Sequence, residues 1–439
     1  MTTVSTAVET RALRKVTRRF LPLAALCTYV LYIDRLNVSV AALTMNKQLG
    51  ISPAAFGLVA GIFFWSYALC EIPSNFALSR VGVRVWVSRI IVSWGVVTMA
   101  TAAVQGLHSL LMLRLLLGVA EAGFSPAMLF FLAGWFPRRN RALATALLTV
   151  AVPFSGITTP ILTHIMTGLD GTLGLPGWRW LFLLTGLPAV VLGVVFYTVA
   201  RNGPDDAAFL APDERRWLNQ QLSPDSEGTS REAFWRGVFN AYVVMLVIVY
   251  MLFACSLWGY QFFIPQILEQ LGLGTNTLGW VVGLPPLLAL GPMLWWARHA
   301  DRKKELTRHY VVAISVAAIG FLFAGLAIDR PVLAITGFCV AGIGLYSCLA
   351  TLLSIPSTFL SGAALAGGLA TMNGLGNFGS YFGPQITGIL RGITGDFTLA
   401  VLFLGLAALA SAALALLLDT RLRRRASPAS THHTAPDHL

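Results

Sequence analysis

The sequence predicts an all-α integral membrane protein with twelve transmembrane helices in two six-helix bundles. Of its 439 residues, 56% are hydrophobic and only 11% are charged, and the mean hydropathy is +0.72. This composition is far more apolar than that of an ordinary soluble domain. Apolar runs of about 20 residues, the length that crosses a hydrocarbon core as a helix, recur along the whole chain. Basic residues gather in every second connection between these runs.

The apolar runs define the predicted membrane spans. Each is long enough to cross the bilayer as one helix, and the first follows a polar N-terminal segment. We therefore expect the first span, rather than a cleaved signal peptide, to direct insertion into the inner (plasma) membrane. The predicted spans are 20–43, 55–78, 86–105, 110–135, 142–167, 179–200, 238–270, 278–297, 309–328, 332–355, 366–391 and 398–418.

The basic residues follow the positive-inside pattern of a chain with both termini in the cytoplasm. They precede the first span and follow the second, fourth, eighth and twelfth. This placement accounts for the net charge of +12 and the pI near 9.9 without a nucleic-acid partner. The residues are Arg11, Arg14, Lys15, Arg18, Arg19, Arg80, Arg84, Arg138, Arg139, Arg141, Arg298, Arg302, Lys303, Lys304, Arg308, Arg421, Arg423, Arg424 and Arg425.

One polar segment, 201–237, divides the chain into two apolar halves. SRVGVR follows the second span at 79–84 and ADRKKE follows the eighth at 300–305, while Leu-Ala-Thr begins the fifth and eleventh spans. Such a repeat predicts two similar bundles around a central cavity. The predicted organisation is a cytoplasmic tail (1–19), a bundle (20–200), a cytoplasmic linker (201–237), a second bundle (238–419) and a cytoplasmic tail (420–439).

Five charged residues lie well inside the predicted spans, and all belong to the first half: Asp34, Arg35, Glu71, Arg114 and Glu121. An unpaired charge at this depth costs several kcal/mol, so such residues usually have a functional role. Arg114 and Glu121 are two helical turns apart, so they share a face and are expected to be partners. The second half has only neutral polar groups at comparable depth, namely Tyr260, Gln261, Asn373, Asn377, Ser380, Tyr381 and Gln385.

Five stretches carry a resemblance to a known family: YIDRLNVSVA, IFFWSYALCEIPSN, RLLLGVAEAGFSPAMLFFLAGWFPRRNRA, GWRWLFLLTGLPA and IPSTFLSGAALAGGLATMNGLGNFGSYFGP. They resemble the anion:cation symporter family of the major facilitator superfamily, and within it bacterial tartrate, phthalate and hydroxyphenylacetate permeases. The resemblance covers roughly residues 20 to 418. It implies twelve helices in the major-facilitator arrangement, alternating access, and proton-coupled import of an organic anion.

The resemblance also implies roles for the buried residues. Asp34 and Glu121 would carry protons, Arg35 and Arg114 would bind the anion, and Tyr67 would line the cavity. Burial and a neighbouring arginine act in opposite directions on the proton affinity of a carboxyl group, so such a group can load and unload protons. The planar fork of arginine matches a carboxylate better than lysine does. Alternatively, Asp34 with Arg114, or Arg35 with Glu121, forms a fixed ion pair between two helices.

The second half is expected to supply the neutral wall of the site. Trp258 with Phe262 and Phe263 forms an aromatic wall that favours an aromatic or otherwise apolar carboxylate, although core packing explains these rings equally well. Asn373 and Asn377 share one helix face, with interhelical hydrogen bonding as the alternative role. The substrate-binding candidates are Arg35, Arg114, Tyr67, Trp258, Tyr260, Gln261, Asn373 and Asn377.

The gate candidates are Glu71, Arg80, Asp301 and Arg302. Glu71 lies one turn after Tyr67, and a structural role is its alternative. Ser79 stands where the family has an acidic residue, which leaves Asp301 and Arg302 as the remaining candidate ion pair at the cytoplasmic gate. Thr185 stands where a glutamate is common in the family.

Other classes of protein find little support in the sequence. No nucleophile, phosphate-binding or metalloprotease motif marks an enzyme, and no cofactor is expected. The five cysteines lie inside predicted spans as packing residues, and His432, His433 and His438 are interpreted as part of a disordered tail rather than a metal site. The expected partners are a small organic anion, protons and the lipid bilayer, and the chain is expected to be a monomer. A drug or metabolite exporter of the same fold is the main alternative.

Overall fold

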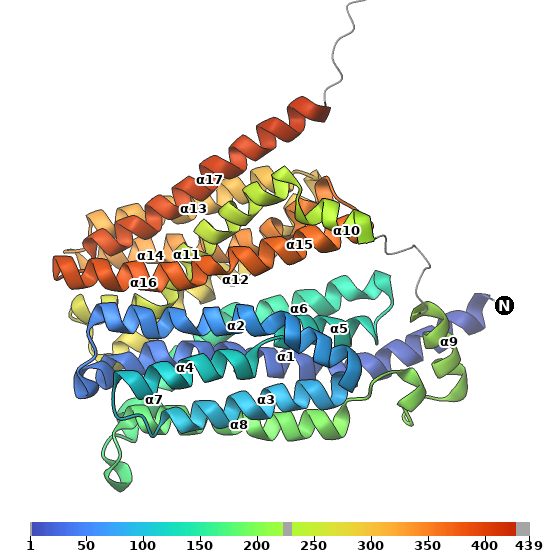
Figure 1. Ribbon diagram of the computed structural model, residues 1–439, viewed down its shortest axis with the longest axis horizontal. Coiled ribbons are helices and arrows are strands. Elements are labelled where there is room, and N and C mark those ends of the chain that lie inside the picture. Colours follow the sequence, from blue (N-terminus) through green and yellow to red (C-terminus); the bar gives the residue numbers. More distant parts are fainter. Residues whose placement is uncertain (1, 223–230, 427–439) are drawn as a thin grey trace, which may run out of the picture.

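The protein is a long bundle of helices (Figure 1). The computed structural model describes residues 2–222 and 231–426, and within these ranges it contains helices and no strands. In the described part of the chain, eleven helical stretches are long and apolar enough to cross a membrane. The all-α membrane fold that the composition predicts is therefore confirmed.

The first half contains four continuous spanning helices and two that are broken. α1 begins at Thr2, so the segment predicted as a tail is a helical extension of the first span. The predicted span 110–135 is divided into α4 and α5 at Gly123, whose φ of +84° favours glycine. The elements are α1 (Thr2–Leu49), α2 (Pro53–Val81), α3 (Val83–Thr101), α4 (Leu107–Glu121), α5 (Phe124–Ala133), α6 (Arg138–Ile157), α7 (Thr159–Gly168), η1 (Thr172–Gly174) and α8 (Gly177–Val199).

The segment between the halves contains η2 (Pro204–Asp206), α9 (Pro212–Leu222) and α10 (Arg231–Val238). α9 packs against the extension of α1, where Arg11 Nη2 lies 3.0 Å from Asp213 Oδ2 and Lys15 Nζ lies 2.6 Å from Glu214 Oε2. α10 packs instead against α15 of the second half. The two described parts of this segment thus belong to different halves.

The second half contains α11 (Ala241–Gln270), α12 (Thr275–Lys303), α13 (Leu306–Leu326), α14 (Pro331–Ser354), η3 (Ile355–Thr358), α15 (Gly362–Gly376), α16 (Phe378–Thr394) and α17 (Thr398–Ala426). The predicted span 366–391 is made by α15 and α16, which have 15 and 17 residues and meet at Asn377. Glycines on both sides of Asn377 are poor helix formers, so the break falls there. Two successive helices therefore make the eleventh predicted crossing, which is not among the eleven single stretches found in the described residues.

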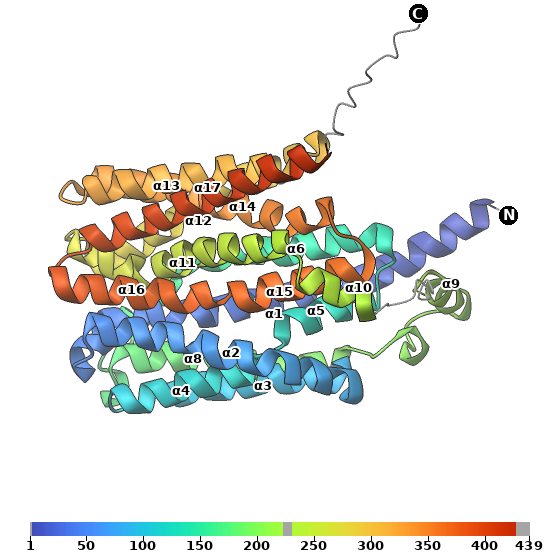
Figure 2. The same ribbon diagram turned by 45° about the horizontal axis from the view of Figure 1, so that its top comes forward.

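The two halves touch closely at the end opposite the polar segment. α2 lies beside α16, as Figure 2 also shows. A Cβ added to Gly57 would lie only 2.5 Å from the backbone oxygen of Pro384, and one added to Gly388 would lie 2.4 Å from that of Pro53. Only glycine permits this approach. Ser39 Oγ of α1 also donates to the backbone oxygens of Gln261 and Phe262 in α11, at 3.0 and 2.9 Å.

Toward the other end, which carries α9 and α10, the helices of the two halves diverge (Figure 1). The structure is therefore closed between the halves at one end of the membrane-spanning region. The charged residues Arg35 of α1 and Glu121 of α4 are buried within the first half.

Candidate functional site

The centre of the candidate site is a buried ion pair between α1 and α4. Arg35 Nε donates to Glu121 Oε1 at 2.7 Å, and Arg35 Nη2 donates to the same oxygen. Arg35 is 8% exposed and Glu121 is fully buried. The other carboxylate oxygen, Glu121 Oε2, has no hydrogen-bond partner in the described residues. A buried pair that leaves an oxygen unsatisfied is a poor stabilising element, and it is better suited to exchanging partners.

Aromatic rings from both halves of the chain surround the Arg35 guanidinium. Its Cζ lies 5.5 Å from the ring centroids of Tyr32 and Phe63, 5.4 Å from that of Tyr67 and 5.7 Å from that of Trp258. Each ring at this distance attracts the cation through its π face. Trp258 belongs to α11, so a residue of the second half contributes directly to the surroundings of a charge in the first. We call these four rings the aromatic cage.

Arg114 has a different partner from the one that its position on α4 predicts. Its Nε donates to the backbone oxygen of Val59 at 3.1 Å and its Nη2 to that of Ala60 at 3.4 Å, both in α2. The expectation that Arg114 pairs with Glu121 is therefore wrong, because Arg35 from α1 occupies that carboxylate. Gly118 explains the short reach to α2, since a Cβ there would lie 2.4 Å from the backbone oxygen of Phe63.

Asp34 lies apart from the ion pair, although it is next to Arg35 in sequence. Asn37 Nδ2 donates to Asp34 Oδ1 at 3.1 Å and also lies within hydrogen-bond distance of Thr185 Oγ1, at 3.0 Å. Asp34 is 1% exposed, and its Oδ2 has no hydrogen-bond partner in the part of the chain that the structure describes. No ion pair joins Asp34 to Arg114 among those residues, so of the two fixed pairs considered from the sequence only Arg35 with Glu121 forms.

Asn37 is a site residue that the sequence analysis missed. It follows Asp34 by three residues on the same helix, and a second polar residue inside an apolar span was the signal that could have identified it. Thr185 of α8 was noted only as a departure from the family pattern. Its Oγ1 also donates to the backbone oxygen of Leu181 at 2.8 Å, so its position is fixed.

The break after Glu121 holds this carboxylate in place. Ser74 Oγ of α2 donates to the backbone oxygen of Ala122 at 2.7 Å, and Trp86 Nε1 of α3 donates to Ser74 Oγ at 3.0 Å. A Cβ on Gly123 would lie 2.4 Å from Ser74 Oγ. The Glu-Ala-Gly sequence thus ends α4 next to two other helices, and the Glu121 side chain points to Arg35.

The neutral candidates of α11 lie near the contact between the halves. Tyr260 and Gln261 line a small cavity of about 20 Å³, together with Ser39 and Tyr346. Gln261 Nε2 lies 3.5 Å from Tyr346 Oη. The Tyr260 ring packs against Phe321 and Phe338 inside the second half, with centroids 5.4 and 5.9 Å apart. These two residues are therefore beside the site rather than in the aromatic cage.

The asparagine candidates lie around the break in the eleventh span. Asn377 forms the junction between α15 and α16, and its backbone N–H donates to the backbone oxygen of Asn373 at 3.1 Å. Within the described ranges, neither asparagine side chain forms a hydrogen bond to Arg35 or Arg114. A substrate role for either residue stays a prediction.

The gate candidates form no ion pair with one another in the described residues. Glu71 is half-buried on α2. The Arg80 guanidinium lies over the Phe76 ring, 4.2 Å from its centroid. Asp301 and Arg302 are both exposed at the end of α12. Their gate roles stay predictions, and His432, His433 and His438 lie outside the described residues.

Comparison with known proteins shows that the chain is similar to a family of membrane transporters. The sequence model of the Major Facilitator Superfamily matches residues 24–384. A protein of Agrobacterium vitis named "Putative tartrate transporter" is 39% identical over 94% of this chain and 93% of its own length. A "Quinolone resistance transporter" of Acinetobacter baumannii is 32% identical over 95% of this chain and 97% of its own length.

A solved structure agrees with the fold. It is a bacterial homologue of the human lysosomal transporter Spinster, in an inward-facing and occupied conformation. It superposes with a TM-score of 0.75 and 18% sequence identity, over 93% of this chain and 98% of that chain. At this identity the likeness shows the fold alone.

Proposed function

Because the chain belongs to the Major Facilitator Superfamily and is a multi-pass membrane transporter rather than an enzyme, we propose that it carries an organic carboxylate together with protons by alternating access. The observation that carries the proposal is the buried pair of Arg35 and Glu121 inside the aromatic cage. An arginine fork held by a replaceable carboxylate is a binding site for a second carboxylate.

Competition for Arg35 provides the coupling mechanism. While Glu121 is ionised, it occupies the guanidinium fork and excludes another anion. A proton on Glu121 removes its negative charge, so the substrate carboxylate can replace it on Arg35. Proton binding and anion binding therefore favour each other, and by thermodynamic reciprocity each promotes the other's uptake. This reciprocity is the requirement for symport.

Asp34 is proposed as a second proton site. It is buried without a cationic partner in the described residues, so its ionised form relies on Asn37 for a hydrogen bond. Neutral Asp34 would complete the site, because a protonated carboxyl group can itself donate from the oxygen that now lacks a partner. The proposed roles of Asp34 and Glu121 thus differ in what each proton changes.

The arrangement of the halves supports alternating access. Close contacts at Gly57 and Gly388 seal one end, while Trp258 brings the second half into contact with Arg35. Movement of the second half relative to the first would therefore alter the aromatic cage and the seal together. The cage also favours a substrate with an apolar or aromatic body beside its carboxylate.

The test of the proposed function is uptake into vesicles that contain the purified protein. We expect an inward proton gradient to drive accumulation of at least one member of a panel of aliphatic and aromatic carboxylates, tartrate among them because of the named relative. Protein-free vesicles are the control. Absence of gradient-driven uptake for the whole panel, with the protein correctly folded and both orientations present, would contradict proton symport of a carboxylate.

Export is the second candidate function, and the 32% identical quinolone resistance transporter favours it. Quinolones are planar aromatic molecules that carry a carboxylate, so the same cage and arginine would accept them. The same vesicles distinguish the two candidates. An exporter would move its substrate in the direction opposite to the flow of protons. If an inward proton gradient drives the substrate out of the vesicles, the protein is a proton antiporter and not a symporter.

The orientation in a bacterial plasma membrane is a further part of the proposal. The basic residues predict that both termini and the segment 201–237 lie in the cytoplasm. Reporter fusions at Asp225, a position outside the described residues, and after Arg425 should therefore both report a cytoplasmic location. A periplasmic signal at either fusion point would overturn this topology.

A further inference from the structure

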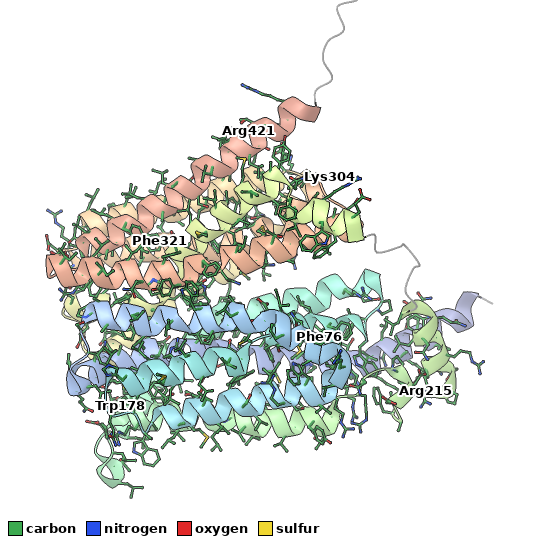
Figure 3. The ribbon with its side chains drawn as sticks, in the orientation of Figure 1. Phe76, Trp178, Arg215, Lys304, Phe321 and Arg421 are labelled. Atoms are coloured by element: carbon green, nitrogen blue, oxygen red, sulfur yellow. The ribbon has the colours of Figure 1, made fainter. Side chains whose placement is uncertain are left out.

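A large pocket lies at the end of the second half, away from the buried charges. Its volume is about 700 Å³, it is open to the surface, and it is lined by the first residues of α11 and α13, the connection after α12, the end of η3 and the last turns of α17. Figure 3 places Lys304 at this end of the half. The lining residues are Asn240, Tyr242, Lys304, Glu305, Leu306, Thr307, Thr358, Phe359, Asp419, Leu422 and Arg423.

The charged groups in and around the pocket leave one cation without a partner. Arg308 lies 3.3 Å from Glu305 and 3.6 Å from Asp419, and Arg423 lies 2.8 Å from Asp419. The two carboxylates are thus already paired with arginines. Lys304 forms no ion pair within residues 2–222 and 231–426. Two cations, Lys304 and Arg423, and two carboxylates, Glu305 and Asp419, line the pocket, so Lys304 is the lining cation that remains for a ligand.

Lys304 also has an unusual backbone conformation. It is the C-cap of α12 with φ 54° and ψ 32°, the left-handed region that glycine or asparagine usually occupies at this position. A side chain with a Cβ is strained there. A strained residue at a pocket is a reason to look for a function, because a glycine would serve the helix end better.

The first turn of α13 faces the same pocket with unused donors. α13 has no side-chain cap, so the backbone N–H groups of its first turn lack helical partners. Thr307, in this turn, lines the pocket and is only 6% exposed, and its hydroxyl makes no hydrogen bond within the described part of the chain. Free N–H groups, a hydroxyl without a partner in the described residues and a lysine together match the oxygens of a phosphate.

We propose that this pocket binds a phosphate ester, and that its source is the headgroup of an anionic phospholipid. Apolar side chains of Leu306, Phe359 and Leu422 line the pocket beside the polar ones, which suits an amphiphile better than a free ion. The pocket lies where the membrane-spanning helices end, and basic pockets at that level attract anionic headgroups. The site is separate from the proposed transport site, and its test requires no transport.

The experiment is thermal melting of the purified full-length protein in detergent with added lipid. Phosphatidylglycerol should raise the melting temperature, because a ligand that binds only the folded protein stabilises it. Lys304→Gly should fold well, since glycine adopts the same φ without strain, but the lipid concentration for half the effect should rise at least about tenfold. Thr307→Val, which keeps the side-chain shape, should weaken the response in the same direction.

Lys303→Ala is the matched control, because Lys303 is a neighbouring exposed cation that does not line the pocket. It should respond to phosphatidylglycerol as the wild type does. Phosphatidylcholine should give a smaller rise, since its headgroup has no net charge. If glycerol phosphate raises the melting temperature as much as the lipid does, the pocket binds phosphate esters but its ligand is a soluble phosphate ester and not a lipid. An unchanged response in both Lys304→Gly and Thr307→Val would overturn the proposal.

Discussion

Replacing Glu121 by glutamine should abolish proton-driven accumulation of the substrate while exchange across the membrane persists. Glutamine has nearly the shape of a protonated glutamate but carries no titratable proton, so Arg35 is permanently available to the anion. One proton per substrate supports a concentration ratio of up to about tenfold per pH unit, because a pH unit corresponds to about 1.4 kcal/mol. In Glu121→Gln this ratio should fall to about 1.

The structure separates this effect from that of Asp34→Asn. Asp34→Asn leaves the pair of Arg35 and Glu121 intact, so accumulation should decrease but substrate binding should still depend on pH. In Glu121→Gln the pH dependence of substrate binding should become much weaker than in the wild type, because the competing carboxylate is gone and Asp34 remains as the proposed proton site. Equilibrium binding measured across a pH series, beside uptake in vesicles, distinguishes these two results.

Glu71→Gln is the matched control for both variants, since Glu71 is a carboxyl group of the same spanning region that forms no ion pair in the described residues. It can alter the rate of transport as a gate residue, but the final accumulation ratio should remain that of the wild type. Full accumulation by the double variant Asp34→Asn, Glu121→Gln would show that other groups carry the coupling protons.

Replacing Arg35 by lysine should weaken substrate binding strongly even though the charge is kept. Lysine cannot present two parallel N–H groups to a carboxylate. Loss of a buried charge-assisted partner costs about 2–5 kcal/mol, which corresponds to some thirtyfold or more in affinity. Arg114→Lys should also weaken binding, but less, because Arg114 now donates to backbone oxygens of α2 rather than to a carboxylate.

Arg84→Lys is the control for a merely structural arginine. Arg84 Nε donates to the backbone oxygen of Tyr197 at 2.7 Å, as Arg114 donates to Val59, but Arg84 is only partly buried at the start of α3. Its replacement should leave substrate affinity unchanged. Binding is measured on purified variants whose folding is verified by thermal melting. Wild-type affinity in a folded Arg35→Lys variant would return the pair of Arg35 and Glu121 to a structural role.

Much of the fold followed from the sequence because the bilayer imposes simple constraints. Spans of about 20 apolar residues must be helical, since no water is available to bond their backbone groups. Each predicted span therefore corresponds to one observed helix or, for 110–135, 142–167 and 366–391, to two successive helices. The break at Asn377 was less visible, because hydropathy does not respond to the backbone freedom that neighbouring glycines provide.

The composition of the site also followed from the sequence. Charged residues inside an apolar span are too costly to be incidental, so Asp34, Arg35, Arg114 and Glu121 were identifiable as a set. Their burial in the structure agrees with that interpretation. What sequence spacing could not supply was the pairing, because it relates residues on one helix and is silent about the neighbouring helix.

The tertiary structure alone decided which charges meet. Arg114 and Glu121 share a face of α4, yet Glu121 accepts its hydrogen bonds from Arg35 of α1. Arg114 donates instead to the backbone of α2, which approaches α4 closely at Gly118. Residue types and burial were thus determined by the sequence, since both follow from local hydropathy. Partner choice depends on the rotation and approach of separate helices, and small residues far from the charges set that geometry.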